Sequence, residues 1–332
     1  MKTLFTFLKI FISLILVITA ISYIFITDQI KGPGGELITV NIPKGSSGSD
    51  IAAILKQKQV IKNPLLFKAA LRIHPPERLS AGSFKLDPSK NIFETIESLQ
   101  SSEPEMHLTT IPEGLTAEEI AELLAKNRLC LKNEFMALIS ENKYSIGGKE
   151  LKSIDGYLFP ETYDFGENIN CDQIIKTMLG EFERRFYPIY RQHKDDMPLP
   201  MTLDKVVILA SLVEREAQVP EERPIIAGVY FNRLKKGMKL ECDATVMFAL
   251  DTKKEILLYR DLEIDSPYNT YKYKGLPPGA IANPGIESLK AVIYPEKHDY
   301  YYYVRNDVKN DGSHVFSKTF QEHNDAIHKY QR

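Results

Sequence analysis

An uncharged apolar run near the N-terminus, Ile10 to Thr27, is the feature that most constrains how this chain can fold. Leu4 to Leu8 extends the run on the far side of Lys9, so its length is close to the ~20 residues of a helix that spans a bilayer. Lys2 and Lys9 precede the run and Asp28 follows it. This excess of lysine predicts a cytoplasmic N-terminus and an extracytoplasmic location for the chain after residue 28.

A cleaved signal peptide is the alternative interpretation of the run. However, the run is long for the apolar part of a signal peptide, and Ser22 to Phe25 offers no small-residue cleavage site. We therefore expect a retained anchor, with residues 1–9 in the cytoplasm and a single transmembrane helix over residues 10–27. A linker over residues 28–36 follows, and its glycines predict a flexible segment.

Composition excludes several classes of function. The chain has 332 residues, which is enough for roughly two domains besides the anchor. Its net charge of −2 gives no basic excess, so we do not expect nucleic-acid binding. The seven histidines form no metal-binding motif, and we expect neither a metal nor a cofactor. Cys130, Cys171 and Cys242 lack CxxC spacing and are expected to be three thiols, although one pair could bridge in an oxidising compartment.

A pattern of strand, Pro-Gly turn and two helices occurs twice after the linker. Ile42 to Gly45 precedes the helical segment Asp50 to Leu55, and Ile111 to Gly114 precedes Glu119 to Leu124. In each copy a Lys-Asn pair and a second apolar helix follow. The repetition predicts a duplicated small module, because a stacked repeat array needs at least about three units.

The first copy continues into Leu79 to Leu86, which alternates like a β-strand. A strand–helix–helix–strand unit of this size resembles a LysM-like carbohydrate-binding module, which we assign to residues 37–106. A second related αβ segment is expected over residues 107–145. Ser49 and Thr116 are the candidate caps of the first helix in the two copies.

Two carboxylates end an almost wholly apolar helical run. Val206 to Val213 leads directly into Glu214-Arg215-Glu216. Because a carboxylate is costly to desolvate, either both glutamates lie at an exposed helix end or one is kept half-buried as a proton donor. Successive helical residues turn by about 100°, so the two point roughly 200° apart and cannot face one cleft. This argues against a paired-carboxylate glycosidase, whose retaining form needs carboxyl groups ~5 Å apart.

Loops rich in proline, glycine and aromatic residues occupy much of the remaining chain, at Gly156 to Tyr163, Tyr268 to Tyr271 and Gly275 to Gly285. Aromatic faces stack on sugar rings, and asparagine side chains bond to hydroxyl and acetamido groups. Core packing explains each aromatic residue taken singly, but their clustering favours a ligand surface. The candidates are Tyr157, Phe159, Tyr163, Tyr268, Asn269, Tyr271 and Asn283, with Asp243 and Thr245 as supporting residues or helix caps.

These motifs, in this order, resemble the endolytic murein transglycosylases over nearly the whole chain. The matching segments are the anchor, Ile42 to Gly45, Gly156 to Tyr163, Leu209 to Ala217, Glu222 to Leu234, Gly237 to Leu240, Tyr268 to Tyr271 and Gly275 to Gly285. One segment departs from the family. Glu241 to Thr245 stands where members usually show Gln-Thr/Ser-Asp-Pro-Thr, so Cys242 replaces a hydroxyl and Ala244 replaces a proline.

The resemblance implies a lytic transglycosylase. Such an enzyme cuts the β-1,4 bond between N-acetylmuramic acid and N-acetylglucosamine in peptidoglycan and leaves a 1,6-anhydromuramoyl end. The second glutamate of the family's ExE motif, here Glu216, is then the catalytic residue, and Glu214 is left to pair with a nearby arginine. Further substrate-binding or supporting candidates are Glu161, Asn232 and Arg233.

The expected architecture is α+β: a transmembrane helix, LysM-like αβ modules and a catalytic domain over residues 146–332. The implied partners are nascent glycan strands and the penicillin-binding proteins that polymerise them. The implied location is the cell membrane, with the catalytic domain outside the cytoplasm. The alternative is a non-catalytic peptidoglycan-binding scaffold; an esterase or protease is disfavoured because the sequence contains no GxSxG motif.

Overall fold

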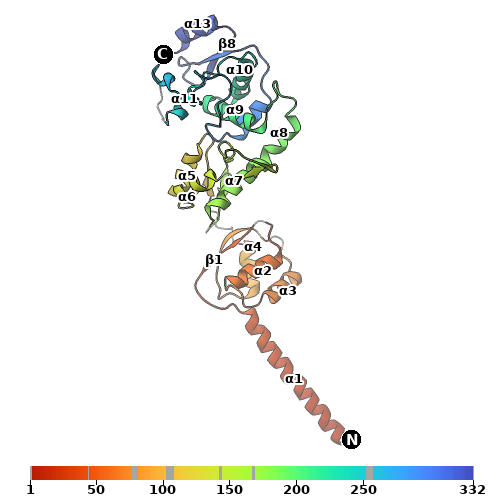
Figure 1. Cartoon of the computed structure of the whole chain (residues 1–332). Coiled ribbons are helices and arrows are strands. Elements are labelled where there is room, and N and C mark those ends of the chain that lie inside the picture. Colours follow the sequence, from red (N-terminus) through yellow and green to blue (C-terminus); the bar gives the residue numbers. More distant parts are fainter. Residues whose placement is uncertain are drawn as a thin grey trace. The chain divides into compact units, whose positions relative to one another are not determined.

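The computed structural model describes residues 2–43, 45–76, 79, 81–101, 108–141, 144–166, 169–251 and 257–331, without the side chains of residues 2–14 and Ser101. The chain divides into two compact units, residues 1–108 with 164–167, and residues 109–163 with 168–332. In the described part helices predominate, and the strands form four two-stranded sheets (Figure 1). The predicted mixed α+β class is confirmed.

The N-terminal helix α1 covers Lys2–Ile30 and is the long red helix of Figure 1. It includes the predicted transmembrane segment 10–27, of which residues 10–14 lie outside the described side chains, as do residues 1–9. Among the residues that the structure describes, no helix is both long and apolar enough to cross a membrane.

The segment after α1 is not a free linker, which corrects the expectation of flexibility. The backbone N–H of Gly34 donates to the carbonyl of Pro88 at 2.9 Å. A Cβ atom at Gly32 would collide with the same carbonyl, so only glycine allows the chain to approach this closely. Lys62 Nζ also lies 3.0 Å from Asp28 Oδ1 near the end of α1. The segment is therefore part of the first unit.

The first unit has the predicted strand–helix–helix–strand order. β1 (Ile38–Ile42) pairs antiparallel with β2 (Gly82–Leu86), and Val40 lies opposite Phe84. The helices between them are α2 (Gly48–Gln57) and α3 (Pro64–Ile73), and α4 (Ile92–Ser101) follows. Strand β2 is shorter than the strand predicted over residues 79–86, of which Ser80 lies outside the described residues. The core of this unit includes Val40, Ile51, Leu55, Phe67, Phe84 and Leu99.

The second copy of the pattern consists of β3 (Leu108–Thr110), α5 (Ala117–Lys126) and α6 (Lys132–Ser140). Here β3 pairs with β6 (Thr162–Asp164). The turn glycines Gly45 and Gly114 have φ angles of 85° and 78°, a conformation that favours glycine. Thr116 caps α5 in a capping box with Glu119, as predicted. In the first copy Ser47, and not the expected Ser49, caps α2.

The rest of the second unit surrounds the apolar helix α9 (Leu203–Glu216), whose residues 206–213 are all buried. Helices α10 (Arg223–Lys235) and α12 (Ile286–Ile293) pack against it. A short hairpin of β7 (Tyr302–Arg305) and β8 (His314–Ser317) lies towards the C-terminus (Figure 1). The other elements are β4 (Ser145–Ile146), β5 (Lys149–Glu150), α7 (Cys171–Arg185), α8 (Tyr187–His193), the 3-10 turns Pro220–Glu222 and Asp261–Glu263, α11 (Asp243–Ala249) and α13 (Phe320–Tyr330).

Two of the three cysteines form a disulfide. Cys130, just before α6, is bonded to Cys171 at the start of α7, with Cα atoms 5.2 Å apart. Cys242 is buried and free. The expectation of three thiols was wrong, and the alternative of one bridging pair is correct.

Candidate active site

Glu216 is the last residue of α9 and emerges where the buried helix ends. The residue is half-buried. Burial raises the pKa of the Glu216 carboxyl, while hydrogen bonds from Cys242 and Tyr303 act to lower it and the charge of Asp243 raises it further. A carboxyl group in these surroundings holds its proton more strongly than one in water, as a general acid must.

Each oxygen of the Glu216 carboxylate has a donor. Cys242 Sγ lies 3.1 Å from Oε1, and the hydroxyl of Tyr303 donates to Oε2 at 2.9 Å. The Tyr303 hydroxyl also lies 3.0 Å from that of Tyr230 in α10. The fold therefore brings residues from α9, α10, the start of α11 and β7 to one carboxylate. Sequence reasoning did not identify Tyr303 or Tyr230 as site residues.

Buried hydroxyl groups of Thr245 and Thr270 hold the backbone of Cys242 in place. Thr245 Oγ1 donates to the carbonyl of Cys242 at 2.7 Å and lies 2.9 Å from Thr270 Oγ1. Thr270 Oγ1 accepts from the backbone N–H of Cys242 at 3.0 Å. These bonds assign Thr245 a supporting position beneath the site.

Asp243 begins α11 and faces the same region. Its Oδ1 accepts a hydrogen bond from the Tyr271 hydroxyl at 2.6 Å. Tyr271 lies close enough that the charges of Asp243 and Glu216 contribute to raising its pKa, after burial. Two of the sequence candidates, Asp243 and Tyr271, are thus brought together beside Glu216.

Glu214 faces a different part of the unit, as its helical spacing from Glu216 predicts. Its Oε2 accepts from the backbone N–H of Gly285 at 3.0 Å, and its Oε1 lies 3.8 Å from Arg223. Only 7% of its side chain is exposed. Glu214 therefore links α9 to the loop before α12 and does not share a cleft with Glu216.

Several residues predicted to line a glycan groove lie instead in the interior. Tyr157 and Phe159 are 3% and 2% exposed. The Tyr157 hydroxyl donates to Asp204 Oδ1 at 2.5 Å, and Phe159 packs beneath Arg185, which is ion-paired with Glu161. The hydroxyl of Tyr163, also buried, donates to the Phe159 carbonyl. Proline and glycine mark these segments as loops, but they do not indicate whether a loop lies at the surface.

Two asparagines predicted to line the ligand surface, Asn269 and Asn283, are buried and form hydrogen bonds with the backbone of loops. Asn283 accepts at Oδ1 from the backbone N–H groups of Gly156 and Leu158, at 3.0 and 2.9 Å, and donates from Nδ2 to the Leu115 carbonyl at 2.9 Å. Asn269 donates to the carbonyls of Leu262 and Ile264, at 2.8 and 2.9 Å.

Asn232 and Arg233, together with Tyr268, also have defined structural contacts. Asn232 donates to the carbonyls of His298 and Tyr300, at 2.8 and 3.0 Å. Arg233 donates to the Tyr301 carbonyl at 2.6 Å, and its ion pair with Glu241 lies on the loop that leads to Cys242. Tyr268 packs against Phe248, with ring centroids 4.8 Å apart. Asn232 and Arg233 therefore bind α10 to the segment just before β7, the strand that carries Tyr303.

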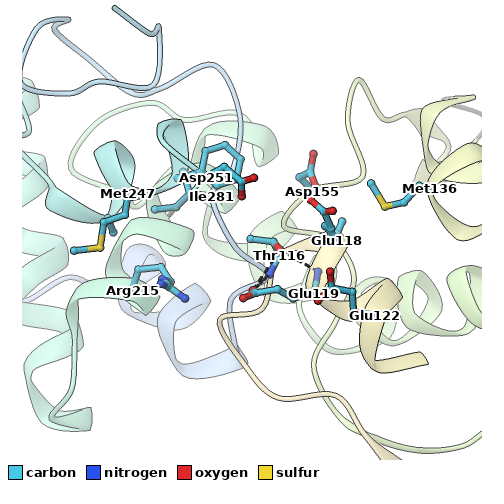
Figure 2. A pocket seen from close by; sticks show the side chains of 13 residues that line it. Thr116, Glu118, Glu119, Glu122, Met136, Asp155, Arg215, Met247, Asp251 and Ile281 are labelled. Carbon is cyan, nitrogen blue, oxygen red and sulfur yellow. Dashed lines mark hydrogen bonds between the residues drawn. The ribbon is translucent and has the colours of Figure 1, made fainter. Parts of the chain in front are cut away.

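A cavity of about 460 Å³ opens beside the end of α9 (Figure 2). Arg215, the neighbour of Glu216, and Ala244, the neighbour of Asp243, both line it. In Figure 2 Arg215 and Met247 lie on one side, and Glu118 and Met136 lie on the other. The remaining lining residues are Thr116, Ala117, Glu119, Glu122, Asp155, Phe248, Asp251 and Ile281. Because two of its lining residues are the chain neighbours of Glu216 and Asp243, this cavity is the best candidate for a substrate cleft.

Comparison with known proteins gives consistent matches. The YceG-like family matches residues 40–329. An endolytic murein transglycosylase of Bacillus subtilis (strain 168) is 34% identical over an alignment of 320 residues that covers 91% of this chain and 87% of that protein. A Streptococcus pneumoniae (serotype 2, strain D39) protein of the same name is 28% identical over 87% of this chain and 57% of its own length. The crystal structure of a putative yceG-like protein from Listeria monocytogenes is 36% identical, with a TM-score of 0.57, over 87% of this chain and 99% of that one.

Proposed function

Because the chain belongs to the YceG-like family, we propose that it is an endolytic lytic transglycosylase of peptidoglycan. It cleaves the β-1,4 bond between N-acetylmuramic acid and N-acetylglucosamine in nascent glycan strands, leaves a 1,6-anhydromuramoyl end and so terminates elongation. The observation that carries this proposal is the half-buried carboxyl of Glu216, which has a donor on each oxygen while Glu214 is turned away.

The reaction needs one carboxyl group that acts twice. Protonated Glu216 gives its proton to the glycosidic oxygen as the bond from that oxygen to C1 of the muramoyl ring breaks. The C6 hydroxyl of the same ring then forms the new bond to C1, and the Glu216 carboxylate accepts the hydroxyl proton. No water enters the product. Because the nucleophile belongs to the same sugar, its effective concentration can reach ~10⁵ M or more.

The cellular setting is part of the proposal. The uncharged run at 10–27 supports a single membrane anchor with the rest of the chain outside the cytoplasm. The Cys130–Cys171 disulfide supports an oxidising compartment. The strand–helix–helix–strand unit supports a LysM-like glycan-binding role for the first unit. Penicillin-binding proteins are the proposed partners, because they produce the strands that the enzyme would cut.

Replacing Glu216 tests the function. We expect Glu216→Gln, which keeps the shape of the side chain but removes the transferable proton, to lower the rate of strand cleavage by about 10²- to 10⁴-fold. The assay uses the full chain in detergent with purified glycan strands and measures strand length and muramoyl ends.

Glu221→Gln is the matched control, because Glu221 is an exposed carboxylate in the turn after α9. We expect it to retain the parent rate. Cleavage by Glu216→Gln at the parent rate would refute the assignment, and glycan binding without any shortening of strands by the parent would favour a scaffold.

A further inference from the structure

The structure contains a second group of polar residues close enough to Glu216 for the charge of His314 to act on its carboxyl group. His314 Nδ1 in β8 lies 2.7 Å from Glu222 Oε2, and the backbone N–H of His314 donates to Glu222 Oε1 at 2.9 Å. The side chains of His314 and Glu222 are only 8% and 11% exposed. The pair therefore joins the turn after α9 to the β7–β8 hairpin in the interior.

This pair supports the ring of Tyr303. The imidazole of His314 meets the Tyr303 ring edge to face, with centroids 5.3 Å apart and planes at 84°. Tyr230 also meets the same ring, at 86° and with centroids 6.4 Å apart. A ring held by two such neighbours has little freedom to move away from the carboxylate that its hydroxyl contacts.

The number of protons on the Tyr303 hydroxyl and the Cys242 thiol limits which hydrogen bonds these groups can donate to Glu216. Tyr303 has one hydroxyl proton, so when it donates to Glu216 Oε2 it must accept from Tyr230 across their 3.0 Å contact. Cys242 offers Oε1 only a thiol, which is a weak donor. Of the two carboxylate oxygens, Oε2 is thus occupied by a strong donor, and Oε1 is the oxygen on which a proton meets less competition.

We propose that Tyr303 is a positioning residue of the reaction: it holds Oε2 of Glu216 so that Oε1 carries the proton exchanged with the glycan, and the Glu222–His314 pair holds the Tyr303 ring in place. This inference rests on the proposed function. In the first step the Oε1 proton moves to the glycosidic oxygen, and in the second step the proton of the C6 hydroxyl returns to Oε1. Tyr303 keeps its own proton throughout.

The inference predicts two effects of Tyr303→Phe. Without the hydroxyl only the weak thiol contact of Cys242 restrains rotation of the carboxyl group, so kcat falls about 10- to 100-fold while KM changes little. A donor that stabilises the carboxylate is also lost, so the pKa of Glu216 rises and the basic limb of kcat/KM moves to higher pH. The titratable groups that face Glu216, and whose own contributions the pH profile includes, are Tyr230, Cys242, Asp243, Tyr271, Tyr303 and His314.

The experiment measures kcat and KM against pH for the full chain with purified glycan strands. The control is Tyr302→Phe, one residue away in the same strand, whose ring packs under Arg233 at 5.1 Å; it should keep the parent kcat and pH profile. Thermal unfolding of each variant verifies the fold. A Tyr303→Phe variant with the parent kcat and the parent pH profile would overturn the inference. If the parent itself forms no anhydromuramoyl ends, the proposed function fails first.

The supporting pair is tested by a double-variant cycle. We expect Glu222→Gln to lower kcat several-fold in the parent but to have no further effect in the Tyr303→Phe background, because the pair acts through the Tyr303 hydroxyl. Losses that add in the double variant would show that Glu222 and His314 do not act through Tyr303.

Discussion

At the scale of single residues, the proposed chemistry depends on how strongly Glu216 holds its proton. Burial raises its pKa, and the thiol of Cys242 and the phenol of Tyr303 lower it. A general acid works best when its pKa lies near the working pH, because it must both hold and release the proton. In the proposed mechanism, the balance of burial and donors around this one carboxyl group therefore sets the pH range of the enzyme.

The thiol at position 242 gives a test of this balance. A hydroxyl is a stronger donor than a thiol, so we expect Cys242→Ser to stabilise the Glu216 carboxylate and lower its pKa. Because the proposed mechanism starts from protonated Glu216, the basic limb of kcat/KM should move to lower pH by about 0.5 to 1 pH unit. A profile measured on purified strands checks this. A limb that stays in place or moves to higher pH would contradict the role given to Cys242.

The surroundings of a residue could be predicted from the sequence only where the local pattern defines them, and the catalytic role of Glu216 came from the family resemblance. Glu216 follows an apolar helical run, and helical spacing separates it from Glu214. Tyr303, by contrast, is one of four consecutive tyrosines at 300–303. Which ring reaches Glu216 depends on the β7–β8 register, in which Tyr303 lies opposite Phe316. No local pattern contains that pairing.

At the scale of elements, the termini and connections of the helices position the site. The two helix caps show what a sequence pattern can and cannot resolve. A capping box needs a serine or threonine three residues before an acidic residue, and Ser47 has this spacing to Asp50 whereas Ser49 does not. The correct cap was therefore available from the sequence. The burial of Asn283 was not, because its partners at Leu115, Gly156 and Leu158 come from two distant loops.

The disulfide is the element-scale connection that can be removed most directly. It closes a loop with a sequence separation of 41 residues between Cys130 and Cys171. In the chain-entropy account a loop of this length stabilises the fold by up to about 4 kcal/mol. We expect Cys130→Ser with Cys171→Ser to lower the free energy of unfolding by about 2–4 kcal/mol, measured by denaturant titration.

The parent in reductant should match this double variant, and reductant should have no effect on the double variant itself. Equal stability of the parent with and without reductant would show that the disulfide does not contribute to the fold.

At the scale of the whole molecule, the chain combines a helix, a small αβ unit and a unit that contains the candidate active site. A membrane anchor would confine that site to a layer near the bilayer, where nascent strands emerge. The contacts of Gly32 and Gly34 with Pro88 attach the segment after α1 to the first unit. An insertion that lengthens the connection between α1 and the first unit must therefore lie before Gly32.

A flexible insertion tests whether confinement sets product length. We expect sixteen Gly/Ser residues between Lys31 and Gly32, which add roughly 20 Å of reach, to shift the lengths of strands released by vesicle-embedded protein. The same insertion between Gly35 and Glu36 is the control. It lies after the contacts of Gly32 and Gly34 with Pro88, so these contacts still hold the first unit at its original distance from α1. Unchanged products from the first insertion would count against confinement as the determinant of length.

Cleavage of glycan strands in H₂¹⁸O, followed by mass spectrometry of the new muramoyl ends, tests the central claim most directly. Intramolecular attack by the C6 hydroxyl through Glu216 predicts 1,6-anhydromuramoyl ends that carry no ¹⁸O, and their loss in Glu216→Gln. Reducing ends labelled with ¹⁸O would show that water is the nucleophile and would contradict the account.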